Sequence, residues 1–335
     1  MTILFCGNNT FDFAGGGADV TDAAGRDSAY SATSILLALP LSSLTGLPIF
    51  RNIGSFTGDF WAHFRMHTPK DMSATGTSRR FLSIADEAGA LLIAIDGVAS
   101  ASTWRVNAYG DTTVAGAAFP MAADTTLLVD VKVTVNSTNI ITEVYIGGVL
   151  ASTATASNFV GLKGLPYRFT LDNKALSTSG ITANRNLYLS EFIFASDEST
   201  VGLRLATLIP AATGTHFDWS GGVAEISDAN LATAAIAATS ALKLSWLPSV
   251  YGGPSSPTAI RAVVSRARAS KGAGGPQRLK HFLRKSTVNY SGTTALVGAL
   301  GLDGTMQVWD SCPWTGLAWV TGDLTSMEVG IETAA

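Results

Sequence analysis

Two histidines four residues apart are the first pair of side chains in this sequence that could bind a metal ion together. They are His63 and His67, in the segment His63-Phe-Arg-Met-His67. On a helix this spacing would aim both imidazoles at one ion, whereas on a strand four residues span about 13 Å, too far for shared coordination. Apolar and polar side chains alternate through residues 60–67, which favours the strand. We therefore expect no metal site here, and no cofactor elsewhere.

The same alternation predicts a strand face of aromatic and polar side chains, a combination that can stack on a sugar ring and hydrogen-bond its hydroxyls. A second such group follows in residues 104–111, near the expected end of another strand. Each group has a plain alternative interpretation, an outer strand face that packs against a neighbouring subunit or domain. The candidate glycan contacts are Trp61, His63, Trp104, Asn107, Tyr109 and Asp111.

Evidence for catalysis is weak in this sequence. The patterns G-x-G-x-x-G, Walker A, H-E-x-x-H and G-x-S-x-G do not occur. The directly adjacent acid pairs are Asp86-Glu87 and Asp197-Glu198. In a strand the members of each pair would point to opposite faces, unlike the paired carboxylates of glycosidases. We expect a non-enzymatic protein, with a carbohydrate-cleaving module as the rival.

Positive charge is concentrated in one segment of a chain whose net charge is only −3. Between Arg261 and Lys285, 8 of the 22 basic residues fall within 25 positions that contain no acid. This cluster suits an acidic partner, and the alternative is a solvated strand face with a loop. The near-neutral total gives no drive toward nucleic acid. The candidate assembly contacts are Arg266, Arg268, Lys271 and Lys280.

Short strands and glycine-rich turns must position these residues, because period-two alternation dominates the first 200 positions. The four valines from Val129 to Val135 define one strand face, and Gly147-Gly148 suits a tight hairpin turn. This pattern predicts an all-β sandwich over residues 1–200. The remaining expected elements are strands at 60–66, 81–85, 91–95, 103–109 and 187–194.

A second, smaller β-sandwich with one short helix is expected over residues 201–335, as an assembly domain. Its helix would start at Thr321, which suits a helix cap, and residues 227–240 would form a linker or a turn of helix after Asp228. The expected strands of this domain are 203–209, 242–247, 259–269, 280–285 and 306–309.

The two cysteines and the apolar stretches bear on the compartment. Cys6 and Cys312 form no C-x-x-C pair, so they are either two buried thiols or a bridge between the ends of the chain. Residues 35–50 are apolar but interrupted by Pro40 and Pro48, and a membrane span needs roughly 20 unbroken apolar residues. With no signal peptide visible, we expect synthesis in the cytoplasm and no membrane insertion.

Two resemblances add to this reading. The string Glu143-Val-Tyr-Ile-Gly-Gly-Val-Leu150, with the later strand at 187–194, resembles the late strands of concanavalin A-like jelly rolls of the laminin-G type, over most of residues 50–195. The segments at 260–279, 288–291 and 315–331 are similar to a domain that recurs in tailed-bacteriophage virion structural proteins. In that group a laminin-G-like module precedes this domain, and the order here is the same.

The resemblance implies a virion structural protein, made in the host cytoplasm and placed on the particle surface. A tail, fibre or spike component would contact other virion proteins and host-surface glycans, and we expect it to be a homo-oligomer. A capsid decoration protein that stabilises the shell is the rival within this class. The rival from another class is a carbohydrate-active module of a depolymerase.

Overall fold

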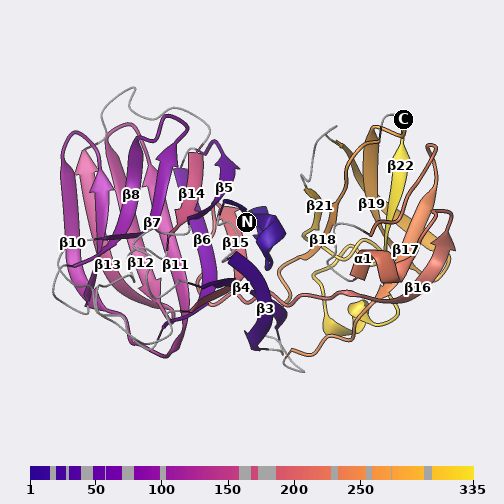
Figure 1. The fold of residues 1–335 in the computed structure, drawn as a ribbon, viewed down its shortest axis with the longest axis horizontal. Coiled ribbons are helices and arrows are strands. Elements are labelled where there is room, and N and C mark those ends of the chain that lie inside the picture. The colour runs from indigo at the N-terminus through magenta and orange to yellow at the C-terminus, as the bar shows by residue number, and fades with distance from the viewer. Residues whose placement is uncertain are drawn as a thin grey trace. The chain divides into compact units, whose positions relative to one another are not determined.

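The computed structural model describes residues 1–15, 20–27, 30–38, 48–56, 58–69, 79–98, 103–157, 167–172, 186–227, 233–253, 259–272, 274–297 and 304–335. These residues form antiparallel β-sheets with one short α-helix, so the expected all-β class is confirmed. The chain divides into two units, 1–205 and 206–335 (Figure 1). None of the described helices is both long and apolar enough to cross a membrane.

The first unit contains an eight-stranded sheet. Its order is β13-β12-β11-β6-β15-β4-β3, and β1 pairs with β15 beside β4. Strand β15 therefore shares one edge between two partners, β4 along 187–189 and β1 along 192–196, with a bulge between them. The strands are β1 (Thr2–Gly7), β3 (Val20–Asp27), β4 (Ser31–Leu37), β6 (Gly58–His67), β11 (Thr126–Val135), β12 (Asn139–Ile146), β13 (Val149–Ser157) and β15 (Leu187–Ser196).

A seven-stranded sheet covers the first in a sandwich, in the order β10-β9-β8-β7-β14-β5-β2. Alternate residues of both sheets, such as Phe64 of β6 and Val106 of β9, meet in one apolar core. This is the outcome that period-two alternation predicts. The strands are β2 (Ala14–Gly15), β5 (Ile49–Gly54), β7 (Arg79–Asp86), β8 (Leu91–Gly97), β9 (Thr103–Tyr109), β10 (Thr113–Pro120) and β14 (Tyr167–Leu171).

The edge strands β10 and β13 approach each other closely and close one side of the sandwich. A Cβ atom at Gly110 would lie 1.6 Å from the Ser157 carbonyl oxygen, and one at Gly116 would lie 2.4 Å from the Thr153 carbonyl oxygen. The Ser152 hydroxyl donates to the Ala117 carbonyl oxygen at 2.7 Å. Two glycines thus permit backbones of opposite sheets to meet where side chains would keep them apart.

The second unit contains a five-stranded sheet, β16-β17-β22-β19-β20, and a two-stranded sheet, β18-β21. The imidazole of His281 on β19 lies between hydroxyls of the smaller sheet, 2.8 Å from Ser265 Oγ on β18 and 2.8 Å from Thr305 Oγ1 on β21. The elements are β16 (Pro210–Phe217), α1 (Val223–Ser227), β17 (Lys243–Pro248), β18 (Val263–Arg268), β19 (Arg278–Lys285), β20 (Val288–Leu296), β21 (Gly304–Trp309) and β22 (Glu328–Ala334).

Two local expectations for the second unit are wrong. Residues 203–209 form no strand: the backbone N–H of Leu205 donates to Glu191 on the bulge of β15, and the next strand begins at Pro210. Thr321 caps no α-helix: residues 321–324 form a single 3-10 turn whose N-cap is Val320. The short α-helix is α1, and Asp228 lies outside the described residues.

Both cysteines are buried and form no disulfide.

Candidate functional site

The outer face of strand β6, for which the sequence left sugar binding and packing as alternatives, is covered. Trp61 is 5% exposed and His63 is fully buried. His63 Nδ1 lies 2.8 Å from Asp130 Oδ1, and the same carboxylate oxygen accepts a hydrogen bond of 2.7 Å from the Thr200 hydroxyl. The segment that follows β15 therefore passes over this face. Trp61 and His63 are unavailable to a ligand in this structure, which corrects the expectation for both.

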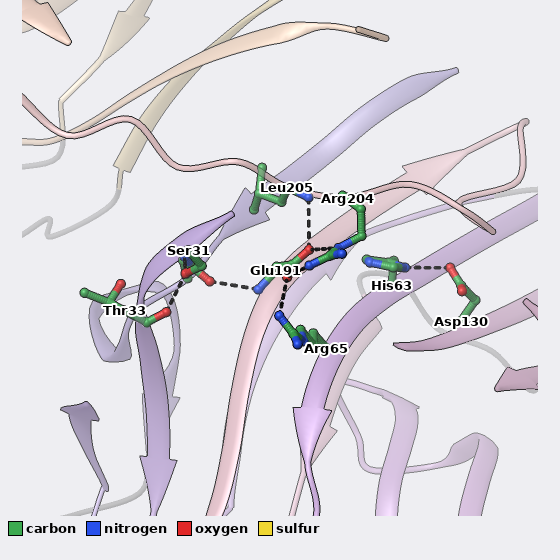
Figure 2. Close-up of polar contacts among 9 residues, drawn as sticks. Ser31, Thr33, His63, Arg65, Asp130, Glu191, Arg204 and Leu205 are labelled. Carbon is green, nitrogen blue, oxygen red and sulfur yellow. Dashed lines mark hydrogen bonds and ion pairs between the residues drawn. The ribbon is translucent and has the colours of Figure 1, made fainter. Parts of the chain in front are cut away.

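Glu191, on the bulge of β15, holds the covering segment in place (Figure 2). Its buried carboxylate accepts hydrogen bonds of 2.7 and 2.8 Å from the Arg204 guanidinium and lies 3.5 Å from Arg65 Nη1. The backbone N–H of Leu205 also donates to it, at 3.3 Å. Its own backbone N–H donates to Asn8 Oδ1 at 2.8 Å.

The backbone conformation of Glu191 is strained, and the pairing of its carboxylate with two arginines stabilises it. Glu191 adopts a φ of 56°, in the left-handed region that non-glycine residues rarely occupy. Burial works against the charge of Arg204, but the hydrogen bonds and charge of Glu191 outweigh it and raise the pKa of Arg204. Burial lowers the pKa of Arg65 despite the same carboxylate. The cluster has the character of a structural clamp, because its charges are already paired with one another.

The outer face of the seven-stranded sheet carries the other sequence-predicted group. Along β9 every second residue is buried, so Trp104 points into the core while Asn107 and Tyr109 point outward. Asn107 Nδ2 donates to Asp96 Oδ2 on β8 at 2.8 Å. Arg80 on β7 donates from Nη2 to the Tyr109 hydroxyl at 3.4 Å and places Nε 3.5 Å from Asp96 Oδ1. We call Arg80, Asp96, Asn107 and Tyr109 the β7–β9 platform.

The electrostatics of the platform suit hydrogen bonding to a neutral ligand. Burial raises the pKa of Asp96, although Arg80 and Asn107 act in the opposite direction. Burial also raises the pKa of Tyr109, so its hydroxyl stays protonated at neutral pH. Arg105 lies opposite Asp96 in the β8–β9 register, and its buried Nε has no hydrogen-bond partner. The platform thus combines a carboxylate, an amide, a guanidinium group and an aromatic ring in a partly dehydrated setting, with a second guanidinium group, that of Arg105, beside it.

The remaining predicted residues are not brought to this platform. Trp104 is 1% exposed with its ring against Phe81, so its assignment as a glycan contact is wrong. Asp111 is exposed in the turn after β9, and no contact described for its side chain joins it to the platform.

The four candidate assembly residues are divided between two sheets and a loop. Arg266 and Arg268 lie on one face of β18, and Lys271 follows in the loop. Lys280 lies on β19 of the larger sheet, where its ammonium is 3.2 Å from Glu332 Oε2. That pairing neutralises one of the four charges. The role of these residues in assembly stays a prediction.

Sequence reasoning missed Arg80 and Asp96 because alternation within one strand does not say which strands are neighbours. Arg80 and Asp96 are register partners across the β7–β8 hairpin. Had that hairpin been paired from its Gly89 turn, the two side chains would have been placed beside Asn107. No group of three or more metal-ligating side chains occurs among the residues that the structure describes.

Comparison with known proteins finds no matching family model and no matching curated protein. Among solved structures, the binding domain of botulinum neurotoxin serotype C1 is 10% identical, with 87% of this chain and 73% of that chain covered and a TM-score of 0.40. A GH131 β-glucanase catalytic domain from Podospora anserina is 15% identical, covering 58% of this chain and 87% of that one, with a TM-score of 0.34.

The CBM2 module of the evolved Dit of Lactobacillus casei BL23 phage J-1 is 10% identical, covering 58% of this chain and 94% of that one, with a TM-score of 0.31. The chain spans about half the length of the first structures it matches, for instance 48% of the serotype D binding domain. Scores of this size assign neither a family nor a ligand. The arrangement of the sheets is that of a two-unit, all-β protein whose first unit is a jelly-roll-like sandwich.

Proposed function

We propose that this protein is a non-enzymatic, glycan-binding structural component of a tailed-phage particle, and that the β7–β9 platform contacts the sugar. The observation that carries the glycan proposal is the platform itself, with Tyr109, Asn107, Asp96 and Arg80 side by side on three adjacent strands. A phenol ring offers an apolar surface for a sugar ring, and the flanking groups donate to and accept from its hydroxyls.

The virion part of the proposal rests on the similarity of the C-terminal segments to phage virion proteins. A surface position as a tail, fibre or spike component fits a glycan-binding first unit, because host attachment starts at such sugars. Capsid decoration is the rival role, and cleavage by a depolymerase is the rival activity.

Screening the full chain against an array of bacterial surface glycans tests the platform. The informative substitution is Tyr109→Ala, which removes the ring and the partner of Arg80. We expect it to weaken binding at least about tenfold, the loss of one stacking contact together with a hydrogen bond.

Tyr145→Ala is the matched control. Tyr145 is also a partly exposed tyrosine on an outer sheet face, with its hydroxyl 3.0 Å from Glu143 Oε2 on β12. Binding should survive this change. Loss in the Tyr145 variant alone would move the site to the eight-stranded sheet and reject the platform, and sugar release by the wild type would favour the depolymerase.

Gold-labelled antibody on purified particles, viewed by electron microscopy, tests the virion role separately. Label on the tail or a projecting spike agrees with the proposal, and label over the whole shell indicates decoration. Absence of label rejects the virion role and leaves the glycan measurement standing on its own.

A further inference from the structure

An apolar groove lies on the first unit, at one end of the closed side of the sandwich. It is a shallow, open hollow of about 310 Å³ between the end of β10 and the β12–β13 hairpin. No charged or hydrogen-bonding side chain contributes to its wall, which consists of Ala118, Phe119, Pro120, Ile146, Val149, Leu150 and Ala151. A polar ligand would find no side-chain partner there.

Two side chains of the groove also project into solvent. Val149 is 70% exposed and Leu150 is 49% exposed, directly after the Gly147-Gly148 turn. Among the described residues of the first unit, these are the large apolar side chains left exposed. Contiguous exposed apolar surface on a soluble protein marks an interaction site, and here two adjacent exposed side chains continue the apolar wall of the groove.

Two of the three strands that flank the groove, β10 and β13, carry no charge at any position. Strand β10 reads Thr-Val-Ala-Gly-Ala-Ala-Phe-Pro and β13 reads Val-Leu-Ala-Ser-Thr-Ala-Thr-Ala-Ser. Edge strands of monomeric proteins are commonly protected by charged side chains, most often lysine. Here β10 meets β13 at Gly116, and the turn before β10 meets it at Gly110, so a partner would dock on their side chains and would not add a strand.

We propose that this surface binds a second copy of the same chain by a two-fold contact. A hollow and an apolar projection lie side by side, so a two-fold axis seats Val149 and Leu150 of each copy in the groove of the other. Identical surfaces bring like charges together when they pair, and the two uncharged strands that frame this groove avoid that repulsion. The proposal is independent of glycan binding, since the platform residues lie on β7, β8 and β9.

Sedimentation velocity of the full chain over a concentration series tests this contact. The wild type should show a reversible monomer–dimer equilibrium, and Leu150→Glu should weaken association at least about tenfold by placing a charge in the apolar contact. Val149 and Leu150 are both exposed in the single chain, so variants at these positions are expected to fold. Near-ultraviolet circular dichroism checks this.

Leu317→Glu is the matched control, because Leu317 in the second unit is 70% exposed, as Val149 is. It should leave association unchanged. A wild type that stays monomeric over the whole series overturns the proposal, and so does equal loss in the Leu150 and Leu317 variants. Val149→Lys should reproduce the effect of Leu150→Glu, since both residues border the same groove.

Discussion

At the scale of single residues, burial of the Asp96 carboxylate lowers the stability of the folded first unit. Burial raises its pKa above the ordinary value of 3.8, so its ionised form is disfavoured in the folded chain. The hydrogen bond from Asn107 and the charge of Arg80 only partly compensate. A residue that costs stability and is placed among ligand-type groups is a typical functional arrangement.

Asp96→Asn should therefore stabilise the first unit at neutral pH while it weakens glycan binding. Because the folded-state pKa is raised, the cost of Asp96 is present above that pKa and disappears as the pH falls through it. The stability difference between variant and wild type should thus shrink on acidification. Chemical denaturation at several pH values and the glycan array measure the two effects. Asp111→Asn, a change in an exposed aspartate, should alter neither, and equal behaviour of the two variants would contradict the prediction.

At the scale of elements, the position of the segment after β15 depends on the charge of Glu191. Glu191→Gln removes the charge that Arg65 and Arg204 share while keeping the size of the side chain. Breaking a buried ion pair from one side typically costs about 3–5 kcal/mol. We expect a loss of that order in the free energy of unfolding of the first unit, measured by chemical denaturation.

Glu198→Gln is the control for this prediction. Glu198 also forms an ion pair, with the amino group of Met1 at 2.8 Å, but its side chain is 56% exposed. An exposed pair contributes roughly 0–1 kcal/mol. Equal losses in the two variants would show that Glu191 is no clamp, and faster proteolysis within residues 197–205 of the Glu191 variant would support its role.

The sequence predicted most strands of the first unit well, but not which of their faces are covered by other segments. Alternation placed β6, β8 and β9 almost to their ends, because a half-buried strand has the same period as its sequence pattern. Asn107 and Tyr109, expected near the end of this last strand, lie on its outward face. Alternation cannot tell an outer face from one covered by a distant segment, so His63 was misassigned: its cover comes from Thr200. Residues 203–209 have the pattern of a strand, yet the backbone N–H of Leu205 donates to Glu191.

At the scale of the whole molecule, each unit has its own apolar core. Burial lowers the pKa of His281 to about 4, from an ordinary 6.5, so the folded second unit keeps this imidazole neutral. The unfolded chain binds the proton between those two values, and stability therefore falls as the pH is lowered from 6.5 to 4. The full effect is about 3 kcal/mol.

Calorimetry should accordingly show two transitions, of which the one from the second unit is more sensitive to this acidification. His281→Gln should reduce the change in stability of the second unit between about pH 7 and about pH 5, which lie on either side of the ordinary histidine pKa. The control is His216→Gln, which measures how the loss of a partly exposed histidine of the same unit affects the transition. A single cooperative transition, or an unchanged slope in the His281 variant, would contradict this account.

The burial of both native thiols has a practical consequence for spectroscopy. Cys6 lies in the first unit and Cys312 in the second, and neither reaches the surface. A cysteine introduced at an exposed position is then the preferred target of a maleimide dye, with the natural residues left in place. Donor and acceptor dyes at Thr113→Cys and Leu317→Cys would report the separation of the two units in solution by energy transfer.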